Sequence, residues 1–117
     1  MLGTFVAQFP TSDLPALALE RAKMSVASTF SSAAMGVSIE SARIIREIER
    51  SLVPHGTSSL WFEAGRLPVD RAARVNALAS DAAASDDSDL RSIAHIGTIV
   101  STTGVAMAEI CRHRWRV

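Results

Sequence analysis

Apolar side chains recur at the period of an α-helix along most of the chain, and this pattern predicts an all-α fold. A short helix over residues 2–9 precedes the helix-start signal TSDLP, in which Ser12 or Asp13 would act as the N-cap. The next helix should run to about Met35, and Gly36 is a suitable C-terminal stop. Its second half lacks charge, so we expect that half to lie between other helices. The main apolar face of this helix comprises Leu19, Ala22, Val26, Phe30, Ala33 and Val37.

Residues 39–52 have the pattern of an amphipathic surface helix, with Ser38 placed to cap it. Ile45, Ile48 and Leu52 predict the side that faces the core. The charged positions predict a solvated face with ion pairs three and four residues apart. These positions are Arg43, Arg46, Glu47, Glu49 and Arg50.

The second half of the chain predicts at most one short strand and two further helices. Residues 58–62 (SSLWF) read as a short strand or an extended loop, and Pro68 opens a helix over about residues 68–84. Residues 85–97 are expected to be irregular, and a last helix should cover about residues 98–112. We expect that helix to bury Ile99, Val100, Met107 and Ile110.

The composition changes this picture by showing more apolar residues than a small domain needs. The 117 residues suffice for a single helical domain over residues 1–117, yet 48% of them are hydrophobic. A small domain has a large surface for its volume and normally needs a polar coat. We therefore expect part of the surface to be buried as a subunit interface or against the rest of a larger protein.

The charge and the cysteine content exclude several classes of protein. Twelve basic and twelve acidic residues give a formal net charge of zero, which disfavours binding to nucleic acid or to an anionic membrane surface. The single cysteine, Cys111, allows no internal disulfide and fits a reducing compartment. The start of the chain lacks the features of a signal peptide, and no uncharged stretch is long enough to span a membrane. We therefore expect a cytoplasmic protein.

Candidate chemistry gathers where the fourth predicted helix ends. Asp86 and Asp87 follow that helix at the negative end of its dipole, where carboxylates cost up to about 1 kcal/mol. They could form a solvated acidic loop, or they could fix the loop and face a polar cavity. A Mg²⁺ or Ca²⁺ site is a third reading, but the run lacks the glycine and distal glutamate of a calcium-binding loop, so we expect no metal.

His95 is the strongest candidate for acid–base chemistry. A lone histidine is more often a packed residue than a catalyst, but His95 lies just before a predicted helix. The positive end of a helix dipole favours neutral imidazole, the form that acts as a general base. Arg91, in the same irregular segment, could pair with Asp87 or Asp89 or could hold a substrate carboxylate.

The order of these residues resembles the MmgE/PrpD family, which includes 2-methylcitrate dehydratase, cis-aconitate decarboxylase and iminodisuccinate epimerase. That family carries a run such as NGALAHALDFDDTH, then HPS some seven residues on, then an alanine-rich helix that ends in AE. The segment NALASDAAASDDSDLRSIAHIGTIVSTTGVAMAE is similar to it, and the upstream segment LGTFVAQFPTSDLPALALERAKMSVASTFSSAAMGV resembles the family's opening. The residues in register are Asn76, Asp86, Asp87, Ser88, His95, Ala108 and Glu109.

The resemblance implies a site and a type of reaction. Family members are large, mostly helical proteins with a second lid-like domain, usually homodimers, and they act without a cofactor on small di- or tricarboxylates. They abstract a proton next to a carboxylate, and elimination, decarboxylation or re-protonation follows. The resemblance implies that His95 and Ser88 belong to the substrate pocket. We therefore expect His95 to be catalytic and Ser88, Asp86, Asp87, Arg91 and Asp81 to contribute to substrate binding. Three family positions differ here: Ala84 replaces an acidic pocket residue, Asp81 a histidine, and Ile96 the proline of HPS.

Two functional hypotheses follow from this resemblance. In the first, the chain is a subunit of a split lyase or isomerase, and a second chain completes the family fold in a homo- or hetero-oligomer. Its substrate would be a small carboxylate or carbonyl compound, and no cofactor would be needed. In the second, the chain is a non-catalytic helical scaffold or partner-binding subunit whose pocket has decayed.

Overall fold

The predicted helical fold is confirmed by the computed structural model, which describes residues 2–85, 88 and 93–114. Within these residues the chain is mostly α-helical, and its small sheet has two strands. A short 3₁₀ turn, Thr11–Asp13, separates the first two helices. In chain order the elements are α1 (Leu2–Gln8), α2 (Ala16–Gly36), α3 (Glu40–Leu52), β1 (Ser58–Ser59), β2 (Arg66–Leu67), α4 (Val69–Ala82) and α5 (Ile96–Arg114).

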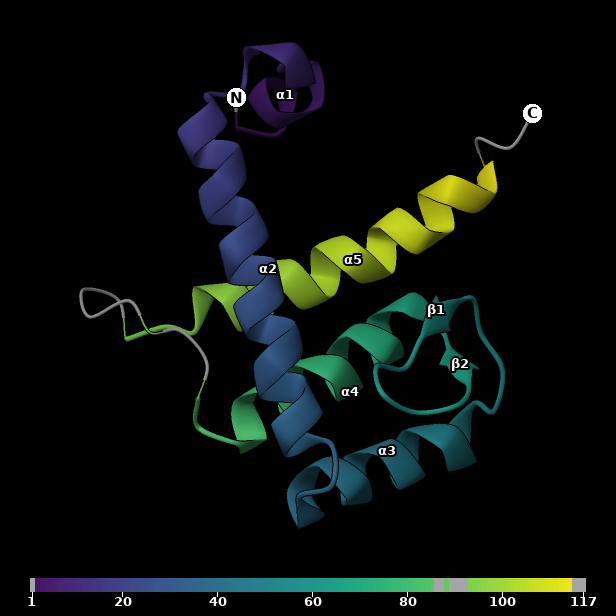
Figure 1. Ribbon diagram of the computed structural model, residues 1–117. Helices are drawn as coiled ribbons and strands as arrows, with labels where there is room; N and C mark the ends of the chain where they lie inside the picture. The colour runs from purple at the N-terminus through teal and green to yellow at the C-terminus, as the bar shows by residue number, and fades with distance from the viewer. Residues whose placement is uncertain (1, 86–87, 89–92, 115–117) are drawn as a thin grey trace.

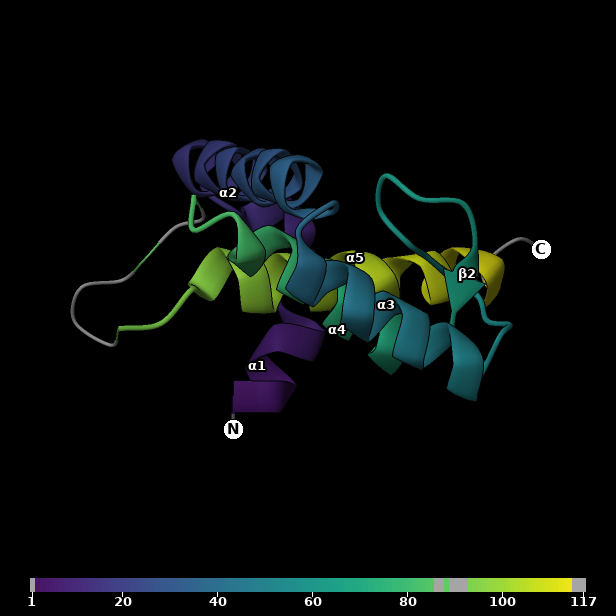
Figure 2. The same cartoon turned by 90° about the horizontal axis from the view of Figure 1, so that it is seen from below.

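Helix α4 is the centre of the fold. It packs against α2, α3 and α5 and touches both strands. Figures 1 and 2 show α2 crossing one face of a layer made by α3, α4 and α5, while Figure 2 shows α1 apart from α2, toward the other side of that layer. The result is a plate of 42 × 41 × 23 Å whose radius of gyration is 15.2 Å. A globular domain of this length has a radius of gyration of about 13.4 Å, so the chain is spread out for its size.

Small side chains let these helices approach closely. Gly36 ends α2 directly against α4, and a Cβ atom added there would lie 1.9 Å from the carbonyl oxygen of Ala79. The interior is correspondingly poor in large aliphatic residues. Phe30 stacks on Trp61, with ring centroids 4.0 Å apart. The buried hydrophobic residues form two clusters, Ala33, Ala42, Trp61 and Ala79, and Leu60, Leu67, Ala72 and Val75.

The strand segment is fastened to the helices by buried hydrogen bonds. Ser58 pairs with Leu67 in the antiparallel sheet, which confirms a strand near the predicted position and adds a second one. Asn76 of α4 accepts from the Trp61 amide and donates to the Ser59 carbonyl, both at 3.0 Å. From α5, a carboxylate oxygen of Glu109 accepts from the Ser59 amide at 2.6 Å. One asparagine and one glutamate therefore hold residues 59–61 between α4 and α5.

The predicted orientation of α3 is wrong in part. Arg43 and Glu47 are exposed and pair four residues apart, as predicted, and Ile45 packs against the core. However, Glu49 of the predicted solvated face is only 3% exposed, whereas the predicted core residue Leu52 is 63% exposed.

Arg71 and Arg74 of α4 pair with the two carboxylate oxygens of Glu49, and Arg46 pairs with Glu63 at 3.3 Å. Buried charges persist when they are paired and hydrogen-bonded. Periodicity alone predicted that Arg46 and Glu49 are solvated, but oppositely charged residues distant in the sequence allow both to be buried.

The predicted inner face of α5 is exposed to solvent. The helix begins at Ile96, two residues before the predicted start. Val100, predicted to be buried, is 62% exposed, whereas Thr102 is 1% exposed. Hydroxyl groups bond within the helix and to α4, so small polar residues can form the inner face. Of the other predicted core residues, Ile99 and Met107 are exposed and Ile110 is half-buried.

The predicted N-cap residues of α2 and α3 are also wrong. Ser12 and Asp13 lie in the 3₁₀ turn, and Pro15 occupies the N-cap position of α2. Ile39, rather than Ser38, occupies the N-cap position of α3. Neither cap residue makes a side-chain capping bond, because proline and isoleucine have no acceptor to offer.

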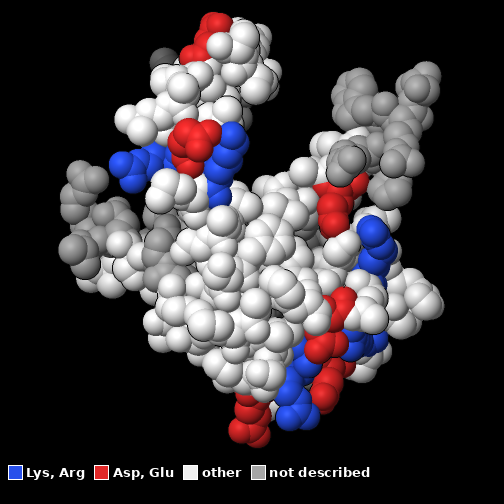
Figure 3. Space-filling model, in the orientation of Figure 1, with Lys and Arg blue, Asp and Glu red and all other residues white. Residues whose placement is uncertain are grey.

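The solvent-accessible surface of the chain is unusually large, and much of it is apolar. The accessible surface is 8133 Å², whereas a folded monomer of 12.5 kDa exposes about 6,200 Å². Figure 3 shows a broad uncharged area over the middle of one face, with charges gathered near the start of α2 and along the opposite edge. Exposed large hydrophobic residues occur on every long helix except α4, among them Leu17, Met24, Met35, Ile44, Ile48, Ile99 and Met107.

Candidate functional site

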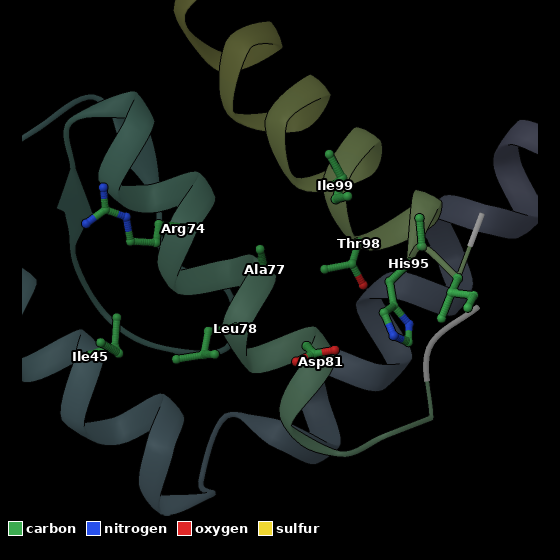
Figure 4. A pocket seen from close by; sticks show the side chains of 10 residues that line it. Ile45, Arg74, Ala77, Leu78, Asp81, His95, Thr98 and Ile99 are labelled. Atoms are coloured by element: carbon green, nitrogen blue, oxygen red, sulfur yellow. The ribbon is translucent and has the colours of Figure 1, made fainter. Parts of the chain in front are cut away.

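An open groove of about 680 Å³ lies where α3, α4 and α5 meet. Its polar residues are Arg74 and Asp81 from α4, His95 just before α5, and Thr98 in the first turn of α5. Figure 4 shows Asp81, His95 and Thr98 at one end and Arg74 toward the other, with Ala77 and Leu78 between them. The remaining lining residues are apolar, namely Ile45, Ile93, Ala94 and Ile99.

The start of α5 fixes the position of His95. Its carbonyl oxygen accepts the first hydrogen bond of the helix, from the amide of Ile99 at 3.1 Å. The Oγ atom of Ser88 lies 3.4 Å from Nδ1 of the imidazole. The two residues are seven positions apart in the sequence, and their side chains bring a hydroxyl and an imidazole together. A substrate oxygen bound by Ser88 would lie beside a group that can exchange protons.

Buried hydroxyl groups anchor this end of α5 to α4. The Oγ1 atom of Thr98 lies 3.1 Å from Oγ of Ser80, and Thr102 donates to the Thr98 carbonyl at 2.5 Å. Ser80 and Thr102 are almost completely buried. The backbone that carries His95 is therefore held against α4, next to Asp81, by contacts that do not depend on a ligand.

The charge at the far end of the groove belongs to a cluster with Glu49. Arg74 donates to one carboxylate oxygen of Glu49 at 2.7 Å, and Arg71 pairs with the other oxygen. Two guanidinium groups share one carboxylate, so the cluster carries one net positive charge. Glu49 is buried and Arg74 is exposed, so this charge faces solvent along the groove.

The family model of the MmgE/PrpD N-terminal domain matches residues 1–114. The chain belongs to the MmgE/PrpD family. This confirms the predicted family and the predicted N-terminal segment. No curated protein and no solved structure shows a significant match.

Within this MmgE/PrpD segment, the structure brings together three of the six predicted site residues. Ser88 and His95 are in contact, and Asp81 lines the same groove as His95. Asp86, Asp87 and Arg91 lie outside the described residues. Of the three positions at which the sequence departs from the family pattern, Asp81 lines the groove and Ile96 directly follows His95.

The third departure, Ala84, lies just beyond α4. Its φ is 49°, a left-handed conformation that often follows the end of a helix, and its amide donates to the Asp81 carbonyl at 2.9 Å. Its side chain is exposed. The residue that replaces the family's acidic group thus forms the C-terminal turn of α4.

The sequence interpretation missed two polar residues of the groove, Arg74 and Thr98. Helical spacing could have found both, because Arg74 lies seven residues before Asp81 on one face of α4 and Thr98 lies three residues after His95. The apolar wall formed by Ile45 and Ile99 was predicted to be core. No local signal could have shown that these side chains line an open groove.

Two further observations concern metals and membranes. Among the described residues, no group of three or more histidine, cysteine or acidic side chains is arranged to hold a metal ion. In the same part of the chain, no helix combines the length and apolar character needed to cross a bilayer.

Proposed function

We propose that residues 1–117 form a single helical domain that supplies one wall of a lyase or isomerase pocket. His95 acts as the acid–base residue and removes a proton from a carbon next to a carboxylate or carbonyl group. Elimination, decarboxylation or re-protonation at that carbon then completes the reaction without a cofactor. Membership of a lyase-containing family supports this class of chemistry, and the contact of Ser88 with His95, a residue that lines the groove, is the observation that carries the proposal.

Each polar residue at the reacting end has a distinct part. The imidazole of His95 takes the proton, and the electron pair of the broken C–H bond moves onto the neighbouring carbonyl or carboxylate group. Ser88 donates a hydrogen bond to an oxygen of the substrate, and the buried hydroxyl of Thr98 helps to fix the helix start that carries His95. Asp86 and Asp87 orient the loop before His95, and Arg91 binds a carboxylate. The roles of Asp86 and Asp87 rest on the family pattern, and that of Arg91 rests on its place in the sequence between Ser88 and His95.

We further propose that polypeptide outside these residues closes the groove, as a partner chain in a hetero- or homo-oligomer. The exposed surface exceeds that of a folded monomer by roughly 1,900 Å². A standard protein interface buries about 800 Å² per partner, and obligate interfaces bury more. The apolar residues Ile48, Leu52, Ile99 and Val100 are exposed on the helices that border the groove. A free, exposed Cys111 thiol suits the reducing interior of a cell, and we propose that the assembly works in the cytoplasm.

Replacing His95 with alanine tests the catalytic assignment. The assembled protein is incubated in D₂O with a panel of small mono-, di- and tricarboxylates and 2-oxo acids, and loss of the substrate C–H signal is followed by proton NMR. General acid–base catalysis contributes about 10²- to 10⁴-fold, so H95A should slow the exchange by that factor. His55→Ala is the matched control, because His55 is exposed and lines a different pocket. Equal exchange by wild type and H95A, or no exchange with any panel member, contradicts the proposal.

A non-catalytic scaffold is the second candidate function. The observation that favours it is Ala84, which brings no carboxylate to the place where the family has one, together with the large exposed apolar surface. A scaffold would retain its assembly in H95A and show no wild-type exchange. The assay above therefore separates the two functions directly.

A further inference from the structure

The groove has an unusual distribution of charge for a site that would bind polycarboxylates. At its reacting end the described ionisable residues are Asp81 and His95. A carboxylate at position 81 repels each carboxylate of a bound ligand, and the repulsion grows as water is excluded. The chain places this charge where the family carries a histidine.

Among the described lining residues, the arginine lies far from that end. Arg74 and Asp81 are seven residues apart on α4, which corresponds to about 10 Å along the helix axis. Arg74 is also engaged by Glu49 at 2.7 Å. A four- to six-carbon acid whose reacting carbon touches His95 cannot place a second carboxylate against this guanidinium without turning it away from Glu49.

The surface between the two ends is apolar. Ala77 and Leu78 lie between Asp81 and Arg74, with Ile45 and Ile99 on the flanking helices. Burial of a CH₂ group on such a surface is favourable, whereas burial of an unpaired carboxylate is strongly unfavourable. The part of a ligand that extends from the reacting end along α4 should therefore be hydrocarbon.

We propose that Asp81 is a specificity-determining residue, and that the site takes a substrate with a single carboxylate or carbonyl group and an aliphatic arm rather than a di- or tricarboxylate. The arm lies over Ala77 and Leu78, and Asp81 disfavours any second carboxylate at the reacting end. This inference rests on the proposed function for the location of the site. It departs from the substrates that family membership alone would suggest.

Binding of a matched pair of acids tests the proposal without any requirement for turnover. Pentanoate and glutarate have the same chain length and differ by a methyl group in place of a second carboxylate. Their affinities for the assembled protein are measured by calorimetry, and the imidazole proton signals of His95 locate the ligand. Wild type should bind pentanoate at least about tenfold more tightly than glutarate. Propane-1,2,3-tricarboxylate should bind more weakly than either.

Asp81→Asn keeps the shape of the side chain and removes its charge, so it should reduce the preference for pentanoate about tenfold, mainly by tightening the binding of glutarate. Asp70→Asn is the matched control, because Asp70 lies on the same helix but lines a different pocket. Equal or tighter binding of glutarate to wild type, an unchanged preference in D81N, or no binding of either acid overturns the inference. A preference for pentanoate in a protein without deuterium exchange would instead remove the proposed function and leave the inference standing.

Discussion

At the scale of single residues, Asn76 shows how one side chain positions a segment distant in sequence. It is 2% exposed, and its amide satisfies the Trp61 amide and the Ser59 carbonyl at once. An apolar replacement would leave two backbone polar groups in the interior without partners. A structural role thus explains Asn76, which is in register with the family's asparagine, whereas His95 lines the groove.

Asn76→Ala should therefore destabilise the protein strongly. Each buried backbone group that loses its partner costs about 1–3 kcal/mol, so with two such groups we expect the free energy of unfolding to fall by about 2–6 kcal/mol. Urea denaturation followed by tryptophan fluorescence measures this change. Ser31→Ala is the control, because its hydroxyl is exposed on α2 and bonds only within that helix; it should stay within about 0.5 kcal/mol. A small effect of N76A would mean that the β1 segment does not need this anchor.

Sequence reasoning named Asp81, Ser88 and His95 but not Thr98 or Arg74. The order of Ser88 and His95 in a known pattern predicted that they share a site, and the structure places them 3.4 Å apart. Helical spacing could have placed Arg74 on the face of Asp81, but nothing near Arg74 in the sequence shows that α3 supplies Glu49 as its partner. The surroundings of a side chain depend on packing between helices, which a one-dimensional pattern does not record.

At the scale of elements, the existence of the helices was predictable and their orientation was not. Periodicity located α2, α3 and α4 to within about two residues, because each has a well-spaced apolar face. The same rule placed Leu52 of α3 and Val100 of α5 in the interior, but both side chains are exposed. Periodicity identifies an apolar face but not the partner it packs against. In this chain those faces are left exposed, while ion pairs and hydroxyl groups form the inner contacts.

The crossing of α2 over α4 depends on the absence of a side chain at Gly36. Gly36→Ala would drive a Cβ atom against the backbone of Ala79, which cannot move without shifting α4. We expect a loss of about 2–3 kcal/mol in the free energy of unfolding. Gly104→Ala is the matched control: nothing lies within 4 Å of its added Cβ, and alanine should stabilise α5 by about 0.5–1 kcal/mol. Thermal unfolding of both variants measures the contrast, and equal shifts would contradict the close packing.

At the scale of the whole molecule, our proposal that further polypeptide covers the chain accounts for both the flat shape and the exposed apolar faces. The excess surface lies on α2, α3 and α5, and two of these helices also border the groove that holds His95. Polypeptide that covered these faces would both complete a hydrophobic interior and close the groove. Exclusion of water would then strengthen the electrostatic effects of Asp81 and His95 on a bound substrate.

Photo-crosslinking from the edge of the groove tests this central claim most directly. Benzoylphenylalanine replaces Ile99, which is exposed beside His95, or Glu47, which lies on the charged surface of α3. After irradiation of the assembled protein, mass spectrometry identifies the crosslinked peptides. Mixing of isotopically light and heavy copies shows whether a crosslink joins two molecules. We expect position 99 to crosslink to polypeptide other than residues 1–117 of the same molecule, and position 47 to remain unlinked. Crosslinks from position 99 that stay within those residues, or an absence of crosslinks, would contradict the account.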